Sequence, residues 1–452
     1  MKLTRTQRPM GRFVSLVASM ALFATACGSG DDSSAKPPTT DGAASSVAAD
    51  STSDDSAPSG LGINPPRSGG DKYLVYVTTL NIGNAWQEEA NNLATAIAKT
   101  PPYDKVIEVR SETVAPDVQS QIAQIQSMVS SGADAIVAYP ISPTGLNAAY
   151  REACDAGVVM VAFDATVTEP CVTNVSYITA PPRDEPDNPT TSFMGYNTAK
   201  ALAELLGGKG NIFVVRGIVG TSTDKVHYDG AIAAFSEYPG IKIVAEYEGK
   251  WDSATQQIET SKALVSFPDV DGIWAGYGES GTIKALQAAG LEIPVTGETS
   301  NFFRVALLNG WPGISAGSPP AQGGIAMKVA IQILLEGPDS APDDIEIPMN
   351  WVPADRVKEC TENTYVQGCN VFPAAKVGDE NTAEIFQPEL LPEASLSSAQ
   401  TGDPTPGMTI EPLPDLSTYQ QPIPHRFVTR QTCPDGWTQG KLPEGVDGCV
   451  EG

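Results

Sequence analysis

A regular alternation of short apolar runs and amphipathic segments between Lys72 and Trp351 constrains the fold more than any other feature of the sequence. Runs such as 73–78 are rich in β-branched and aromatic residues, which is typical of buried strands. Segments such as 84–99 carry apolar residues at helical spacing. Strands that alternate with helices form parallel sheets covered by helices on both faces. The sequence therefore predicts an α/β fold.

The alternation is long enough for two units of similar size. We expect strands at 73–78, 106–109, 135–138, 158–163, 211–215, 242–247, 272–275, 294–296 and 313–316. We expect helices at 84–99, 117–130, 145–156, 193–206, 223–235, 254–265, 280–289, 302–308 and 322–335. In open α/β sheets, ligands bind outside the carboxyl ends of the strands, so the residues that follow each strand are the site candidates.

The N-terminus has the pattern of an export signal. A short apolar run at 13–24 follows four basic residues, namely Lys2, Arg5, Arg8 and Arg12. This run is shorter than the roughly 20 apolar residues that span a bilayer as a helix. The residues Ala24-Thr25-Ala26-Cys27 resemble the lipobox of bacterial lipoproteins, which implies a signal peptide at 1–26 and an acylated Cys27. An ordinary signal peptide with a chance cysteine is the alternative.

Two segments fall outside the alternation. Residues 27–71 contain no aromatic side chain and are rich in Ser, Asp, Ala, Gly and Pro. Such a segment cannot bury enough apolar surface to offset its chain entropy, so we expect a disordered acidic linker. Residues 359–452 are rich in Pro, Gly and acids and hold four cysteines. We expect an irregular C-terminal extension that disulfides hold on the domain.

The charge balance excludes one class of partner. The chain has 54 acidic residues against 28 Lys and Arg, a net charge of −26. Nucleic-acid binding needs basic patches, so we expect no nucleic-acid partner. The same charge repels anionic lipid headgroups, which leaves the lipid anchor as the only expected membrane contact.

The seven cysteines point to disulfides. If Cys27 is acylated, six remain, and an even set outside the cytosol suggests pairing. Six cysteines allow 15 pairings, among which we favour sequence neighbours: Cys154–Cys171, Cys360–Cys369 and Cys433–Cys449. The chain has no CxxC pair and only two histidines, so we expect neither a metal nor a cofactor.

Several short motifs stand near the expected strand ends, in a particular order along 72–350. They are Thr79-Leu80-Asn81, Tyr139-Pro140 with Ser142, Phe163-Asp164, 217–222, Trp251-Asp252 and 285–290. Their order resembles that of the periplasmic sugar-binding proteins of ABC importers, the ribose-binding type (periplasmic binding protein type I). The resemblance implies two Rossmann-like lobes joined by three hinge strands. It divides the chain into lobe 1, at 72–178 and 319–345, and lobe 2, at 182–317 and 346–358.

The resemblance also implies eight ligand-binding residues. Trp86 and Trp251 would offer flat faces to the C–H groups of a sugar ring. Polar contacts to hydroxyl groups would come from the others, namely Asn84, Asp164, His227, Tyr277, Glu298 and Ser318. His227 and Ala165 stand where the family often has Arg. A less cationic site of this kind suits a deoxy-sugar, a polyol or a small non-sugar.

Structural roles are open alternatives for these residues. Trp86 and Trp251 could serve packing, and Asp164 could cap a helix or stand in a hinge. His227 could be a plain surface residue, and Thr299 could take the place of Glu298 in the alignment.

The resemblance implies an extracytoplasmic substrate-binding lipoprotein of an ABC importer. It would be a monomer that captures a sugar-like solute between closing lobes and delivers it to a permease. A sensory protein that presents its ligand to a membrane receptor, or one that binds a non-sugar metabolite, is the alternative. The chain lacks the G-x-S-x-G and H-E-x-x-H motifs, so we expect no enzyme. A transcription regulator of this fold would need an N-terminal helix-turn-helix where the export signal stands.

Overall fold

A computed structural model describes most of the chain from residue 64 onward. The described residues are 64–80, 83–177, 193–298, 300–347, 351–353, 359, 371, 390–414, 437–441 and 447–451. They belong to one compact unit that spans 58–452. The expected signal peptide, Cys27 and most of the linker lie outside the described residues, as do Cys360, Cys369 and Cys433.

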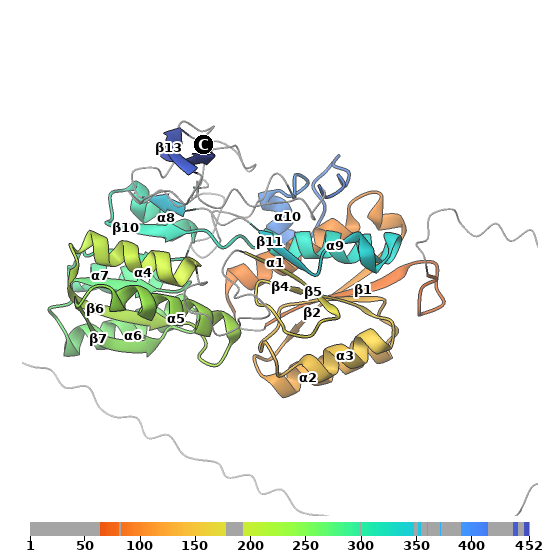
Figure 1. The fold of residues 1–452 in the computed structure, drawn as a ribbon, viewed down its shortest axis with the longest axis horizontal. Helices are drawn as coiled ribbons and strands as arrows, with labels where there is room; N and C mark the ends of the chain where they lie inside the picture. The colour runs from red at the N-terminus through yellow and green to blue at the C-terminus, as the bar shows by residue number, and fades with distance from the viewer. Residues whose placement is uncertain are drawn as a thin grey trace, which may run out of the picture. The chain divides into compact units, whose positions relative to one another are not determined.

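The first sheet is parallel throughout and has the strand order β11-β5-β4-β3-β1-β2. Its strands are β1 Tyr73–Leu80, β2 Ile107–Val114, β3 Ala135–Ala138, β4 Val159–Phe163, β5 Val172–Tyr177 and β11 Asp344–Ile347. Its helices are α1 Ala85–Lys99, α2 Val118–Ser130, α3 Asn147–Asp155 and α9 Ala321–Glu336. Helices α1 and α9 pack together on one face, and α2 and α3 on the other (Figure 1). The inner strands β1, β3 and β4 are therefore buried on both sides, as their apolar sequences predicted, whereas most side chains of the edge strand β2 are exposed.

The second sheet has the order β12-β10-β9-β8-β6-β7. Its strands are β6 Lys209–Arg216, β7 Gly240–Glu248, β8 Gly272–Ala275, β9 Val295–Gly297, β10 Gly313–Ala316 and β12 Trp351–Pro353. Its helices are α4 Phe193–Leu205, α5 Ser222–Ser236, α6 Ser253–Ser266, α7 Glu279–Ala289 and α8 Asn301–Leu308. Strand β12, which the sequence did not predict, runs antiparallel to β10 at one edge of this otherwise parallel sheet.

Alternate residues of β6 serve the two faces of the second sheet. Phe213 and Val215 pack into a core with residues of α6, α7 and α8. Ile212 and Val214 pack into a separate core with residues of α4 and α5. Successive side chains of a strand point to opposite faces, which explains the two cores. The expected α/β architecture of two sheets covered by helices is confirmed.

The C-terminal extension is not irregular throughout. Its described part contains the helix α10 Leu396–Thr401, which packs against α1, and an antiparallel hairpin of β13 Trp437–Lys441 and β14 Asp447–Glu451. Leu390 and Leu391 are buried in the core of the first sheet.

The disulfide Cys154–Cys171 is confirmed. The other two expected disulfides stay predictions, because three of their four cysteines lie outside the described residues.

A buried ion pair joins the extension to α9. The Lys328 ammonium donates to the carbonyl oxygen of Leu390 at 3.0 Å and to the Glu393 carboxylate at 3.1 Å. Both side chains are almost wholly buried, and burial lowers the pKa of Lys328.

No helix in the part of the chain that the structure describes is long and apolar enough to cross a membrane.

Replacing Glu393 by Ala is expected to lower the free energy of unfolding by about 3–5 kcal/mol, because an uncompensated ammonium would be left buried. Chemical denaturation checks this. Asp403→Ala is the matched control, since Asp403 forms an exposed ion pair with Lys99 at the same junction, at 3.5 Å. An exposed pair contributes about 1 kcal/mol or less. Equal losses for the two variants would contradict the prediction.

Candidate functional site

A cavity lies at the carboxyl ends of strands from both sheets. It has a volume of about 30 Å³. Ten residues line it: Asn84, Trp86, Gln87, Tyr139, Asp164, Thr223, Trp251, Tyr277, Glu298 and Ser318. Tyr139 directly follows β3 and Asp164 directly follows β4 in the first sheet, and Glu298 directly follows β9 in the second. This is the edge at which open α/β sheets bind ligands.

The structure brings seven of the eight expected site residues together around this cavity. The exception is His227, which lies one layer behind the lining, with its Nδ1 atom 3.6 Å from the Glu298 carboxylate. His227 is 5% exposed, so the alternative of a plain surface residue was wrong. The role of all eight as ligand contacts stays a prediction.

Three lining residues were not expected: Gln87, Tyr139 and Thr223. Tyr139 belongs to a motif that follows the third expected strand, so its place after β3 was a usable signal. Thr223 lies in the first turn of α5, and Gln87 in the first turn of α1. Polar residues in the first turn of a helix that follows a strand could therefore have been included among the expected site residues.

Hydrogen bonds link residues of the two lobes at the cavity. The Tyr139 hydroxyl lies 2.9 Å from the Thr223 hydroxyl, which donates to the Asp164 carboxylate at 3.4 Å. The Asn84 amide caps α1 by accepting from the Gln87 N–H at 3.0 Å, and it donates to the Trp251 carbonyl oxygen at 3.3 Å. These polar contacts are of the kind that a ligand hydroxyl could replace.

Trp86 serves both the core and the cavity. Its ring meets Tyr139 edge to face, with centroids 6.1 Å apart, and stacks with Phe163 at 6.5 Å. Its indole N–H donates to the Ser318 carbonyl oxygen at 2.6 Å. The packing role proposed as an alternative is therefore real, and it fixes the ring at the cavity wall.

Two lining residues have left-handed backbones. Asp164 has φ 64° and Trp251 has φ 54°, a region that non-glycine residues rarely adopt. The Trp251 indole lies against the backbone of Gly217, where an added Cβ atom would be 2.1 Å from the ring. Such strained positions persist only where the surrounding structure holds them in place. They are found most often at ligand-binding and active sites.

The two lining carboxylates have raised pKa values. Burial raises the pKa of Asp164 to about 7. Burial and the charge of Asp164 raise the pKa of Glu298 to about 8. Burial lowers the pKa of His227 to about 3, which keeps the imidazole neutral. None of the ten lining residues is Lys or Arg.

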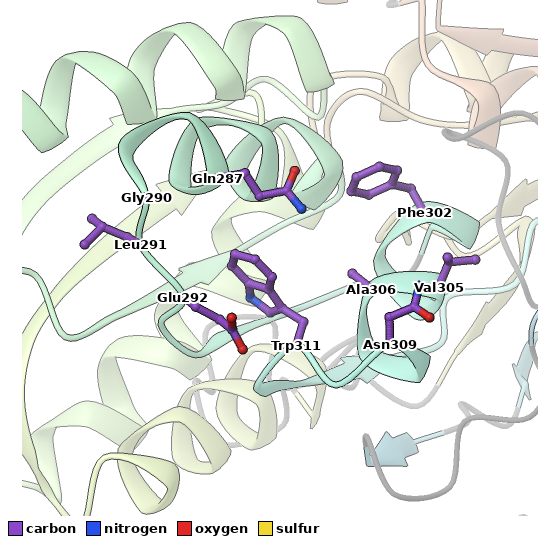
Figure 2. A pocket seen from close by; sticks show the side chains of 9 residues that line it. All are labelled: Gln287, Gly290, Leu291, Glu292, Phe302, Val305, Ala306, Asn309 and Trp311. Atoms are coloured by element: carbon purple, nitrogen blue, oxygen red, sulfur yellow. The ribbon is translucent and has the colours of Figure 1, made fainter.

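A larger hollow of about 530 Å³ lies elsewhere on the second lobe. Figure 2 shows it between α7 and α8, with Gln287 and Phe302 at its upper side and Trp311 below them. It contains none of the expected site residues. Leu291 and Trp311 precede β9 and β10, so the hollow lies at the amino ends of these strands. The smaller cavity, at the carboxyl ends, is therefore the better candidate site.

A family model described as "Periplasmic binding protein domain" matches residues 75–338. The chain belongs to this family. The match covers the α/β part of the chain from β1 to the end of α9, and it confirms the resemblance in the sequence.

Three similar proteins illustrate the membership. A xylitol-binding protein of Mycolicibacterium smegmatis is 26% identical over 267 residues, which are 56% of this chain and 70% of the relative. A D-ribose/D-allose-binding protein of Pseudomonas aeruginosa is 28% identical over 188 residues, 40% of this chain and 55% of that protein. An ABC transporter solute binding protein from Thermobispora bispora, known from a crystal structure, is 26% identical in sequence to this chain. The two structures superimpose with a TM-score of 0.56 over 77% of this chain and 100% of the other chain.

The raised carboxyl pKa values predict a pH dependence of stability. Because the folded chain holds these protons more tightly than the unfolded chain, this stabilisation is present at acidic pH and is lost as the pH rises through about 7 for Asp164 and about 8 for Glu298. The lowered pKa of His227 makes the stability rise with pH instead. That rise is complete above roughly pH 6.5, the ordinary histidine pKa, so it does not add to the change at higher pH. Between about pH 6.5 and 8.5, the free energy of unfolding should therefore fall by about 3 kcal/mol from the carboxyls alone.

Denaturant titrations of the wild type and of a double variant, Asp164→Asn with Glu298→Gln, check this pH dependence. The amide variant cannot titrate at these positions, so its stability should stay nearly level over the same interval. Parallel profiles for the two proteins would show that the carboxyls do not carry the effect.

Proposed function

We propose that this chain is the extracytoplasmic solute-binding component of an ABC transporter and that it captures a sugar-like solute between two lobes. Membership of the periplasmic binding protein family supports binding rather than catalysis. The names of two relatives, which specify xylitol and D-ribose or D-allose, support a polyol or sugar. The solute would pass to a membrane permease.

The composition of the cavity is the observation that carries the proposal. Trp86 and Trp251 offer aromatic faces for the apolar C–H groups of a sugar or polyol. Asp164 and Glu298 offer carboxylates, and four neutral polar side chains offer further hydrogen bonds to hydroxyls: Asn84, Gln87, Thr223 and Ser318. Hydrophobic faces with a few convergent polar groups are what a small-molecule site needs.

The size of the cavity supports a closing mechanism. Small-molecule pockets usually measure about 300–1,000 Å³, whereas this cavity measures about 30 Å³. A sugar therefore enters only if the two sides move apart, and the hinge strands expected between the lobes would allow that. Ligand would then stabilise the closed form through its greater affinity for that form, which the permease reads.

The same proposal places the chain on the outer side of the membrane. Acylation of Cys27 would anchor it, and the acidic linker at 27–71 would hold the folded part away from the bilayer.

Trp251→Ala and Asp164→Ala should each weaken solute binding by about tenfold or more, because each removes a group from the cavity wall. A thermal-shift screen of sugars, polyols and small metabolites first identifies a ligand. A ligand at 100 times its dissociation constant stabilises by about 2.7 kcal/mol, which is readily detected. Isothermal titration calorimetry of the variants then measures the loss of affinity.

Gln287→Ala is the matched control for these variants. Gln287 is exposed and lines the larger hollow of Figure 2, so its removal should leave the affinity unchanged. Cooperative unfolding of all three variants shows that the fold is kept. Wild-type affinity in both cavity variants would remove these residues from the site.

Cys27→Ser should release the chain from the cell membrane, since a serine at this position cannot be acylated. Fractionation of cells that express the full chain checks this, together with incorporation of a labelled fatty acid. Cys154→Ser, which removes only the disulfide to Cys171, should still incorporate the label. Equal labelling of Cys27→Ser and wild type would contradict lipidation at Cys27.

A further inference from the structure

Two acidic side chains and no basic side chain stand among the ten residues that line the candidate site. Asp164 and Glu298 come from different sheets, and both are buried at the same cavity. Both carboxyl groups line this cavity, and no Lys or Arg lies among the ten lining residues. Burying like charges without a compensating cation costs free energy.

Two arginines of the second lobe have other partners. Arg216 pairs with Asp224 at 2.6 Å and with Glu246 at 3.4 Å. Arg304 is buried and donates to the Ser315 hydroxyl at 3.3 Å. His227 contacts Glu298 but is neutral, because its burial lowers its pKa. Among the ten described residues that line the cavity, no Lys or Arg therefore balances the two carboxyl groups.

The aromatic lining points in the same direction. Four aromatic residues line the same cavity as the two carboxyl groups: Trp86, Tyr139, Trp251 and Tyr277. Ring faces attract ammonium groups through their quadrupoles, most strongly for Trp and most strongly when the cation is desolvated. A set of aromatic rings with carboxylates is the arrangement that proteins use to hold organic cations.

We propose that the solute carries an ammonium group on a polyhydroxylated carbon skeleton, as in an amino sugar or an aminopolyol. This inference rests on the proposed function and narrows its ligand class. The ammonium would donate to Asp164 and Glu298 and lie against the aromatic rings. The neutral polar side chains would bond to the hydroxyl groups.

The raised carboxyl pKa values agree with this arrangement. The ten lining residues include no Lys or Arg, so burial favours the protonated form of both acids and raises both pKa values. An ammonium at hydrogen-bonding distance would lower both pKa values and keep the carboxylates ionised. A neutral sugar would give no such compensation.

Matched pairs of solutes test the inference directly. Calorimetric titrations of the full chain at about pH 6.5, where the amines are protonated, compare D-glucosamine with D-glucose, D-galactosamine with D-galactose, and D-glucamine with D-sorbitol. We expect the amine to bind at least tenfold more tightly within the pair that fits the site. Glu298→Gln should reduce this ratio of affinities about tenfold, and Ser318→Ala, which removes no charge, should leave the ratio as it is.

The outcomes separate the inference from the proposed function. Equal or tighter binding of the neutral member would overturn the inference and leave the proposed function standing. An amine preference that Glu298→Gln and Asp164→Asn both leave intact would also overturn it, because the carboxylates would not be its source. Failure of every amine and every neutral sugar or polyol in a thermal-shift panel would count against both.

Discussion

Parallel strands end together at one edge of their sheet, and this constraint decides where most candidate site residues stand. Asp164 follows β4 in the first sheet and Glu298 follows β9 in the second, and both reach one cavity. The bond between the Tyr139 and Thr223 hydroxyls links the two sides there. Separating the sides would break these contacts, so a ligand that replaces them can control whether the lobes close.

The sequence predicted the α/β elements from β1 to α9 well, because buried strands and amphipathic helices have distinct apolar periods. It missed β5, β11 and β12. Val172–Tyr177 is short and interrupted by polar residues, and Asp344–Ile347 alternates acids with isoleucine, so neither reads as a buried strand. These strands are set by pairing with distant segments, which a local pattern does not contain.

The site could be predicted in outline because strand ends are visible in the sequence. The structure places seven expected residues around the cavity but sets His227 behind Glu298. The face of α5 that turns inward depends on packing against other elements, and the sequence alone does not specify it. The buried pair of Lys328 and Glu393 was also missed, because its members are 65 residues apart. Its burial shows that the segment of the extension around Leu390 and Glu393 packs on the folded domain.

Closure of two lobes on a solute is the central claim, and a distance between the lobes measures it most directly. Spin labels on unnatural amino acids at Ser127 in α2 and Ser261 in α6 would report this distance by pulsed electron spin resonance. We predict a distribution that shifts to a single shorter distance when a ligand from the screen saturates the site. Identical distributions with and without that ligand, at concentrations where calorimetry shows binding, would contradict the claim.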